Sequence, residues 1–227
     1  MIPWENLDRA RAPGGAELSL HRRGDEYVIR VGGSDLMNNR QHGSEDALAE
    51  LGCAGLGTAP RARVLIGGLG MGFTLRAALD RLAPTAAVEV AELVPAVIAW
   101  NRGLLAPLAG APLEDPRVTV HTGDVVALIA GSRDRYDAIL LDVDNGPDAL
   151  TSPSNARLYG VNGLARIRTA LAPHGILGVW SAADDVRFTA RMARAGYEVR
   201  VERVLARHNA RRPRGKRHVI WIARRRD

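Results

Sequence analysis

The chain has 227 residues, a formal net charge of +6 and a hydrophobic content of 46%, with only 4% aromatic residues. This length suits one α/β domain with a full core and a small appendage, and the lone cysteine, Cys53, excludes an intrachain disulfide and a cysteine-rich metal site. No stretch reaches the roughly 18 apolar residues that cross a bilayer, and the first residues lack the order of a secretory signal. We therefore expect a cytoplasmic protein that does not enter the membrane and requires no metal.

The first 43 residues are expected to form an appendage to the main domain. Residues 1–15 are polar and glycine-rich near their end, which predicts a loosely held arm. Residues 16–31 alternate apolar and polar positions around a central turn, as is typical of a β-hairpin. Residues 35–43 lack a regular pattern, so we expect a loop that forms the wall of a site. Residues 44–227 are then predicted to form the catalytic domain.

A glycine-rich turn is the strongest local signal in the chain. Residues 64–66 are apolar and predict a buried strand, and a helical pattern begins at Phe73. Between them, Gly68, Gly70 and Gly72 let the backbone turn tightly and approach a ligand. Dinucleotide and adenosyl cofactors both bind at such turns, and some tight turns of this kind hold no ligand at all.

Strand and helix patterns alternate from residue 61 onward, which predicts a parallel sheet with right-handed crossovers. We expect strands over 63–67, 87–91, 117–121, 136–141 and 176–180, and helices over 44–51, 72–82, 95–105, 124–130, 161–172 and 184–195. Two last strands, over 197–203 and 218–223, are predicted to pair antiparallel. The predicted fold is an α/β, Rossmann-like sheet of seven strands with helices on both faces, preceded by the small β-hairpin.

Acidic residues follow three of the predicted strands. Glu92 ends the second strand about 20 residues past the glycines, where a carboxylate can accept both hydroxyls of a ribose. Asp124 follows the third strand, and Asp142 and Asp144 follow the fourth, although Asp144 also suits a simple turn. Because ligands of open α/β sheets bind at the carboxyl edge of the strands, we expect these acids to surround one site.

The order of these motifs resembles the spermidine synthase-like branch of the class I S-adenosylmethionine-dependent methyltransferase superfamily. The likeness runs from about residue 16 to residue 180 and includes the hairpin, the glycine turn, Asp115-Pro116-Arg117, the acids after the strands and Leu158-Tyr159. It implies that the glycine turn holds the amino acid or aminopropyl part of the cofactor, that Glu92 binds the ribose and that Asp124 contacts the adenine amino group.

The same resemblance implies that Asp142 lies beside the transferred group and helps to deprotonate an acceptor amine, and that the protein forms a homodimer. The predicted cofactor-binding residues are Gly68, Gly70, Met71, Gly72, Glu92, Leu93, Gly123, Asp124 and Asp142. The predicted catalytic residues are Asp142, Asp144 and Tyr159. The expected cofactor is S-adenosylmethionine or its decarboxylated analogue.

The chain departs from polyamine synthases at the glycine turn. Those enzymes carry an acid where this chain has Met71, and in them the acid grips the amine of the aminopropyl group. We therefore expect methyl transfer to a small-molecule acceptor, which needs donor and acceptor in line and a carboxylate that removes or orients one proton. Two alternatives stay open: aminopropyl transfer from decarboxylated S-adenosylmethionine, with a diamine held by Asp142, Asp144 and Tyr159, and a non-catalytic binding protein.

Basic residues gather over 207–218 and 224–226. Such a run can attract phosphates or an anionic substrate. No aromatic residues are interleaved in the longer run for stacking on bases. We therefore expect a solvated loop, with nucleic-acid binding as the less favoured alternative.

Overall fold

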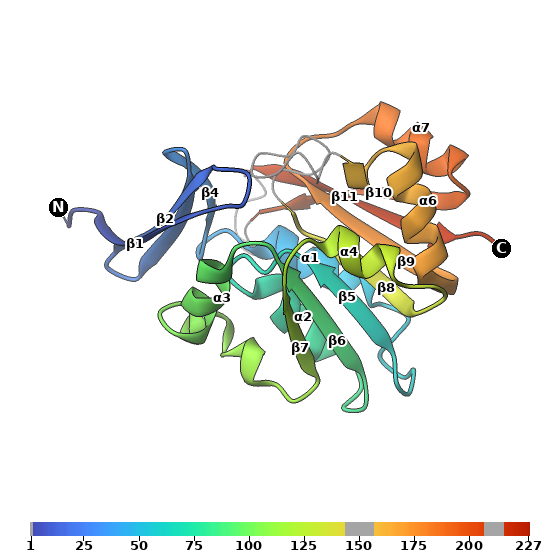
Figure 1. The fold of residues 1–227 in the computed structure, drawn as a ribbon, viewed down its shortest axis with the longest axis horizontal. Coiled ribbons are helices and arrows are strands. Elements are labelled where there is room, and N and C mark those ends of the chain that lie inside the picture. Colours follow the sequence, from blue (N-terminus) through green and yellow to red (C-terminus); the bar gives the residue numbers. More distant parts are fainter. Residues whose placement is uncertain (1, 144–156, 207–215) are drawn as a thin grey trace.

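The computed structural model describes residues 2–143, 157–206 and 216–227, which form two β-sheets (Figure 1). The first sheet is antiparallel, in the order β1-β2-β3-β4. Its strands are β1 (Glu5–Arg11), β2 (Glu17–Arg23), β3 (Glu26–Val31) and β4 (Ser34–Asn38). The second sheet has seven strands among the described residues, in the order β10-β11-β9-β8-β5-β6-β7.

The second sheet is mostly parallel, as the alternation of strand and helix patterns predicts. Its strands are β5 (Arg63–Gly67), β6 (Ala87–Glu92), β7 (Val118–Thr122), β8 (Tyr136–Leu141), β9 (Leu171–Ser181), β10 (Tyr197–Leu205) and β11 (Arg217–Arg225). The five strands from β5 to β9 pair parallel, whereas β11 pairs antiparallel with both β9 and β10. The predicted antiparallel pairing of the last two strands is thus confirmed.

Helices cover both faces of this sheet. They are α1 (Gly43–Gly52), α2 (Phe73–Arg81), α3 (Pro95–Arg102), α4 (Val125–Ala130), α6 (Val161–Ala170) and α7 (Val186–Arg194), with 3₁₀ turns at Ala106–Ala109 and Pro112–Glu114. In β5, Val64 and Ile66 join one buried cluster with α1, α2 and α3, while Leu65 joins the other with α4, α6 and α7. The alternation of side chains along a strand therefore builds two core layers from one apolar run. None of the described helices is long and apolar enough to span a bilayer.

The N-terminal sheet corrects two expectations about residues 1–43. The predicted arm contains β1, which pairs with β2 and whose Asp8 carboxylate accepts a 2.6 Å hydrogen bond from the indole N–H of Trp100 in α3. The predicted loop over 35–43 contains most of β4. The sequence pattern fails for β1 because it is an edge strand whose side chains are exposed or half-buried, so no apolar alternation marks it. The division of the chain at residues 43 and 44 stays a prediction.

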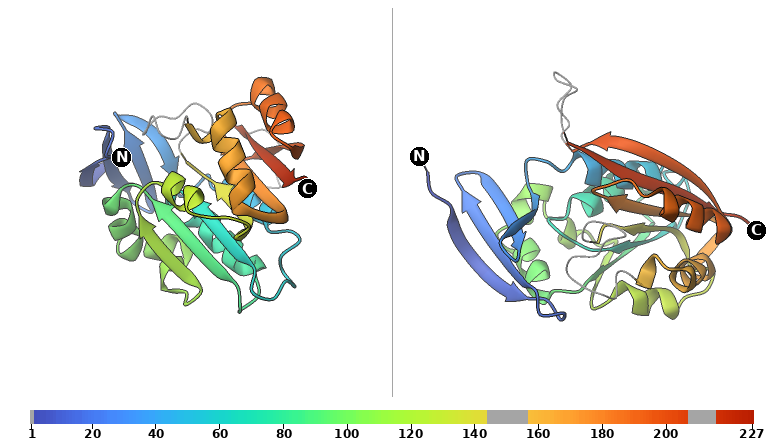
Figure 2. Two further views of the ribbon diagram at one scale, coloured as in Figure 1. Left: turned by 45° about the vertical axis from the view of Figure 1, so that its right-hand side comes forward. Right: turned by 90° about the horizontal axis from the view of Figure 1, so that it is seen from above.

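The N-terminal sheet lies at one end of the molecule, next to α3 and beyond the carboxyl edge of the large sheet (Figure 2). Leu18, Leu20 and Ile29 of this sheet are buried in the same cluster as α1, α2 and α3. The two sheets therefore share a core, and the smaller sheet covers the edge at which parallel sheets bind ligands.

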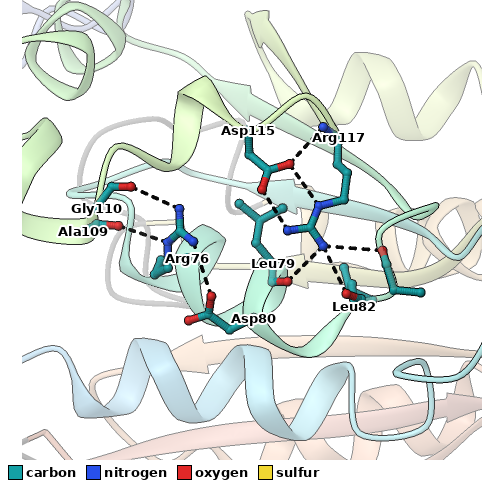
Figure 3. Close-up of polar contacts among 9 residues, drawn as sticks. Arg76, Leu79, Asp80, Leu82, Ala109, Gly110, Asp115 and Arg117 are labelled. Carbon is teal, nitrogen blue, oxygen red and sulfur yellow. Dashed lines mark hydrogen bonds and ion pairs between the residues drawn. The ribbon is translucent and has the colours of Figure 1, made fainter.

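Arg117, which precedes β7, ties that strand to the end of α2 (Figure 3). Its guanidinium donates two hydrogen bonds, of 2.8 and 2.9 Å, to the Asp115 carboxylate. The same side chain donates to the carbonyl oxygens of Leu79 and Leu82, each at 3.0 Å. These carbonyls lie at the end of α2, where they lack an intrahelical hydrogen-bond partner, so the arginine satisfies them. Its positive charge also interacts favourably with the negative end of the helix dipole.

We expect Asp115→Asn to lower the free energy of unfolding by about 1 kcal/mol at pH 7, since the ion pair lies near the surface and is partly screened. The hydrogen bonds from Arg117 lower the pKa of Asp115 to about 2. The contribution is therefore complete above the unfolded pKa of about 3.9 and is lost as the pH falls to about 2.

Urea denaturation across this pH range measures the difference. Asp80→Asn is the matched control, because Asp80 pairs with Arg76 at 3.3 Å but its side chain is 61% exposed. Equal stability of the parent and Asp115→Asn proteins at pH 7 would show that the Arg117–Asp115 ion pair does not stabilise the fold.

Candidate functional site

A cavity of about 310 Å³ lies between the carboxyl edge of the large sheet and the N-terminal sheet. Leu18, Ile29 and Met37 line it from the N-terminal sheet. The predicted cofactor-binding residues that line it are Gly68, Gly70, Glu92, Leu93, Gly123, Asp124 and Asp142. Folding therefore brings together the glycine turn and the ends of β6, β7 and β8, as the parallel topology predicts.

The glycine turn after β5 is tightly packed at two of its positions. Gly68 has a φ of +88°, and a Cβ there would lie 2.1 Å from the backbone oxygen of Asp142. Gly70 has a φ of +53°, and a Cβ there would lie 2.8 Å from the sulfur of Met37 in β4. The positive φ favours glycine at both positions. At Gly68 the fixed backbone oxygen also leaves no space for a side chain, whereas at Gly70 the flexible Met37 side chain could move aside. The turn is thus packed between the end of β8 and the N-terminal sheet.

Glu92, at the end of β6, holds the turn as well as lining the cavity. The residue is only 8% exposed. Its carboxylate accepts hydrogen bonds from the backbone N–H groups of Leu69, at 2.9 Å, and Val94, at 2.8 Å. A carboxylate has about four acceptor positions, so it can accept from these amides and from ligand hydroxyls together. The geometry is compatible with the predicted contact to a ribose.

Asp124 is the N-cap of α4, and its side chain accepts a 2.9 Å hydrogen bond from the N–H of Val126. The preceding Gly123 donates its backbone N–H to the carbonyl of Glu92, which ties the ends of β6 and β7 together. Asp124 therefore caps α4, a role that favours Asp or Asn, and it also lines the cavity.

Asp142 and Glu45 bring two carboxylates to the same cavity. Asp142 follows β8 and accepts a 2.6 Å hydrogen bond from the hydroxyl of Thr74, and burial raises its pKa. Glu45 lies in the first turn of α1 and is 5% exposed. Burial raises the pKa of Glu45, and the negative charge of Asp142 raises it further, while a hydrogen bond from Ser44 opposes the rise. The two acids thus destabilise each other's ionised forms.

Ser44 connects Glu45 to β11. Its hydroxyl donates to the Glu45 carboxylate at 2.5 Å and lies 2.8 Å from Nδ1 of His218, which is 174 residues further along the chain. Burial lowers the pKa of His218 to about 4, with a smaller contribution from Lys216, so the ring is neutral at pH 7. Because Ser44 has one proton and gives it to Glu45, Nδ1 of the neutral ring donates to Ser44 and Nε2 is left as an acceptor.

Three predicted site residues are not among the residues that line the cavity. The Met71 side chain is fully buried in the core, and Gly72 is the N-cap of α2. The Tyr159 ring packs edge-to-face on Phe188, with 5.5 Å between centroids, in the core layer of α4, α6 and α7. The positions of these residues therefore do not support the prediction that their side chains contact a ligand in the cavity.

The structure leaves some predicted residues outside the described part of the chain. Asp144 and the turn-rich loop that follows it fall within residues 144–156, and most of the basic run falls within residues 207–215. The hypotheses that depend on them, an acceptor contact from Asp144 and a binding function of the basic loop, therefore remain predictions.

Glu45 and Trp180 also line the cavity, although the sequence pattern assigns neither residue to the site. Asp35 lines it from the predicted wall over residues 35–43, and Lys216 and His218 line it from the end of the predicted basic run. In the sequence, Glu45 reads as an ordinary acid in the first turn of a helix, and His218 reads as a residue of the last strand. The local sequence pattern does not indicate that Glu45 and His218 lie close together, because their distance depends on how α1 and β11 pack beside β9. The predicted wall over residues 35–43 was the one hint that the N-terminal region contributes.

No family model matches the chain. The chain is 36% identical over 124 residues to polyamine aminopropyltransferase 1 of Streptomyces coelicolor and 33% identical over 147 residues to polyamine aminopropyltransferase of Corynebacterium efficiens. These alignments cover 54% and 63% of this chain but 22% and 26% of the relatives. The chain thus aligns with about a quarter of the length of the curated relatives it matches.

Solved structures agree with the fold. Spermidine synthase from Thermotoga maritima superposes with a TM-score of 0.75 at 18% identity, over 97% of this chain and 73% of that protein. A spermidine synthase in complex with the transition-state analogue AdoDATO gives a TM-score of 0.74 at 17% identity, over 97% and 72%. The α/β fold with a seven-stranded sheet and the resemblance to spermidine synthases, both predicted from the sequence, are confirmed.

The expectation of methyl transfer is contradicted, because both curated relatives are named for aminopropyl transfer. That expectation depends on the missing acid at Met71, which removes a partner for a substrate amine. The folded chain instead places Glu45 at the cavity together with Asp142. The cavity therefore contains a carboxylate besides Asp142 even though position 71 is not acidic.

We expect Glu92→Ala to weaken the binding of 5′-methylthioadenosine about tenfold or more, since hydrogen bonds to a charged acceptor contribute about 1.5–3 kcal/mol each. The variant is also expected to have a lower thermal midpoint, because the N–H groups of Leu69 and Val94 lose their acceptor. Calorimetric titration at a temperature where circular dichroism finds both proteins folded measures the affinity. Unchanged affinity would remove Glu92 from the adenosyl site.

Proposed function

We propose that this chain is a transferase that moves an aminopropyl group from decarboxylated S-adenosylmethionine to an amine of the polyamine class and releases methylthioadenosine. The observation that carries the proposal is the cavity itself, in which the glycine turn and Glu92 lie beside the acids Asp142 and Glu45. The similar proteins are named polyamine aminopropyltransferase and spermidine synthase, which supports the same reaction.

The edge of the large sheet suits the adenosyl part of the donor. The turn at Gly68 and Gly70 lets a ligand approach the backbone closely, and the start of α2 contributes its positive dipole end. In this proposal Glu92 accepts hydrogen bonds from the ribose hydroxyls. Asp124, which lines the cavity at the neighbouring strand end, contacts the adenine amino group.

The charge of the cavity favours the decarboxylated donor over S-adenosylmethionine. Glu45 and Asp142 line the cavity together with Asp35, and Lys216 is the lining cation among the described residues. S-adenosylmethionine carries a carboxylate that would add a negative charge next to these acids, whereas the decarboxylated donor carries only cationic groups. Opposite charges attract strongly where water is partly excluded, so the same acids also attract a polyamine.

In this reaction the donor's sulfonium supplies the leaving group, and the attacking nitrogen must be neutral. The chain has to hold the nitrogen and the propyl carbon in line at about 3–3.5 Å. Asp142 accepts the proton that the acceptor nitrogen gives up, and its raised pKa suits a general base that works near neutral pH. The hydroxyl of Thr74 fixes the orientation of that carboxylate. The homodimer implied by the family resemblance is part of this proposal.

The direct test incubates the protein with decarboxylated S-adenosylmethionine and a panel of putrescine, cadaverine and spermidine. Methylthioadenosine and a product longer by one aminopropyl group are expected, detected by mass spectrometry. The matched control replaces the donor with S-adenosylmethionine, from which no methylated amine is expected. Absence of methylthioadenosine with every acceptor would overturn the proposal.

Asp142→Asn is expected to lower kcat by about 100-fold or more, the usual contribution of a general base. Its affinity for methylthioadenosine is expected to stay within about twofold of the parent, because the adenosyl part is held elsewhere. Steady-state kinetics and calorimetry measure the two quantities. An unchanged kcat would exclude Asp142 as the base.

A further inference from the structure

Glu45 is a buried carboxylate in the wall of the cavity, and it forms no ion pair with any residue that the structure describes. It lines the cavity with Asp142, and among the described residues neither acid forms an ion pair. Their side-chain hydrogen-bond partners among the described residues are neutral hydroxyls, Ser44 for Glu45 and Thr74 for Asp142. A charge taken out of water is unfavourable unless it is paired or neutralised by a proton. A cationic group in the cavity would therefore stabilise the ionised form of both acids.

The position of Glu45 is held from two sides. The N–H of Gly43, at the start of α1, donates to the carbonyl of Ala206 at the end of β10, at 2.9 Å. Ser44 then connects Glu45 to His218 of β11. This arrangement holds the carboxylate at the cavity wall and leaves it little freedom to reach solvent.

His218 is a further buried polar residue in the wall of the cavity. It lines the cavity and is 6% exposed, and its Nε2 is buried with no hydrogen-bond partner among the described residues. The adjoining Trp180, whose ring lies 4.7 Å from that of His218, also lines the cavity, and its indole N–H is likewise buried without a partner in that part of the chain. Buried polar atoms are rarely left unsatisfied. Neither nitrogen has appreciable accessible surface, so both lie beneath the cavity wall, and a ligand reaches them only if a side chain moves.

We propose that Glu45 is a substrate-binding residue that, together with Asp142, holds a primary ammonium group of the substrate. The proposal rests on the proposed function of the same cavity and adds a residue that determines which ligands the cavity accepts. An ammonium has three N–H donors, enough to bond both carboxylates at once. The ammonium belongs either to the aminopropyl group of the donor or to the acceptor amine.

The test compares Glu45→Gln, which keeps the shape and removes the charge, with Glu50→Gln. Glu50 lies on the same helix, and its side chain is 42% exposed and paired with Arg81 on the surface. Calorimetry measures binding of decarboxylated S-adenosylmethionine and of methylthioadenosine, which lacks the aminopropyl group, and kinetics measures KM for the diamine.

In Glu45→Gln, the affinity for decarboxylated S-adenosylmethionine is expected to fall about tenfold or more if the ammonium is the donor's. If the ammonium is the acceptor's, donor affinity stays unchanged and KM for the diamine rises by a similar factor. Methylthioadenosine affinity is expected to stay within about twofold in either case, and Glu50→Gln is expected to change none of these values.

Two further readouts separate binding from a structural role. Glu45→Gln is expected to keep or raise the thermal midpoint without ligand, because the variant no longer buries a charge. In the parent, ammonium binding stabilises the ionised carboxylates and releases protons near neutral pH, seen as a binding enthalpy that depends on the buffer, and the release is expected to shrink in the variant. The charged or titratable groups around Glu45 are Asp142, His218, Lys216 and the His42–Asp46 pair.

The outcomes distinguish this inference from the proposed function. A parent that releases methylthioadenosine while Glu45→Gln matches it in donor affinity, diamine KM and proton release would overturn the role of Glu45 alone. A parent that binds neither the decarboxylated donor nor a diamine would overturn both proposals. A large fall in the thermal midpoint of Glu45→Gln, with equal loss of methylthioadenosine binding, would assign Glu45 a structural role instead.

Discussion

The close approach of Gly68 to the backbone oxygen of Asp142 is the constraint on which the site depends. With a Cβ only 2.1 Å from that oxygen, any other residue would push the end of β5 away from the end of β8. The contact sets the distance between the turn and the acidic end of β8. Glu92 then holds the turn from the other side through the N–H groups of Leu69 and Val94. Backbone packing, rather than any single ligand contact, positions the carboxylates.

The same packing carries an electrostatic cost. Glu45 and Asp142 both have raised pKa values because they are removed from water, and Asp142 adds its charge to the burden on Glu45. A protein selected only for stability would place apolar or neutral side chains at such positions, because a buried charge without an oppositely charged partner destabilises the fold. Perturbed acids in a cavity are typical of functional sites, where the ligand supplies the missing charge. The cost is thus concentrated where a cationic substrate can offset it.

The cavity belongs to two sheets at once. The large sheet contributes the strand ends and the N-terminal sheet contributes Leu18, Ile29 and Met37, and the two share one hydrophobic cluster. The Asp8–Trp100 hydrogen bond adds a polar link between them. Because the smaller sheet encloses the carboxyl edge, it lowers the exposure of the site to water, which strengthens every charge interaction inside. The hydrogen bonds of Arg117 to Asp115 and to α2 lie away from this cavity. They stabilise the fold and do not contribute to the site.

Local sequence patterns were enough to predict the large sheet and the acids at its carboxyl edge. Strand and helix periods are local properties, and parallel topology places the ends of successive strands together, so Glu92, Asp124 and Asp142 were predictable. These patterns missed β1, whose polar side chains leave an edge strand without apolar alternation. Only the tertiary structure brought Glu45 to Asp142 and to His218, because contacts between α1 and β11 span 174 residues and follow from antiparallel pairing at the far side of β9. The prediction of methyl transfer was contradicted by the relatives that the chain resembles. It rested on Met71 alone, and a change at one position does not show which acids other helices bring to the cavity.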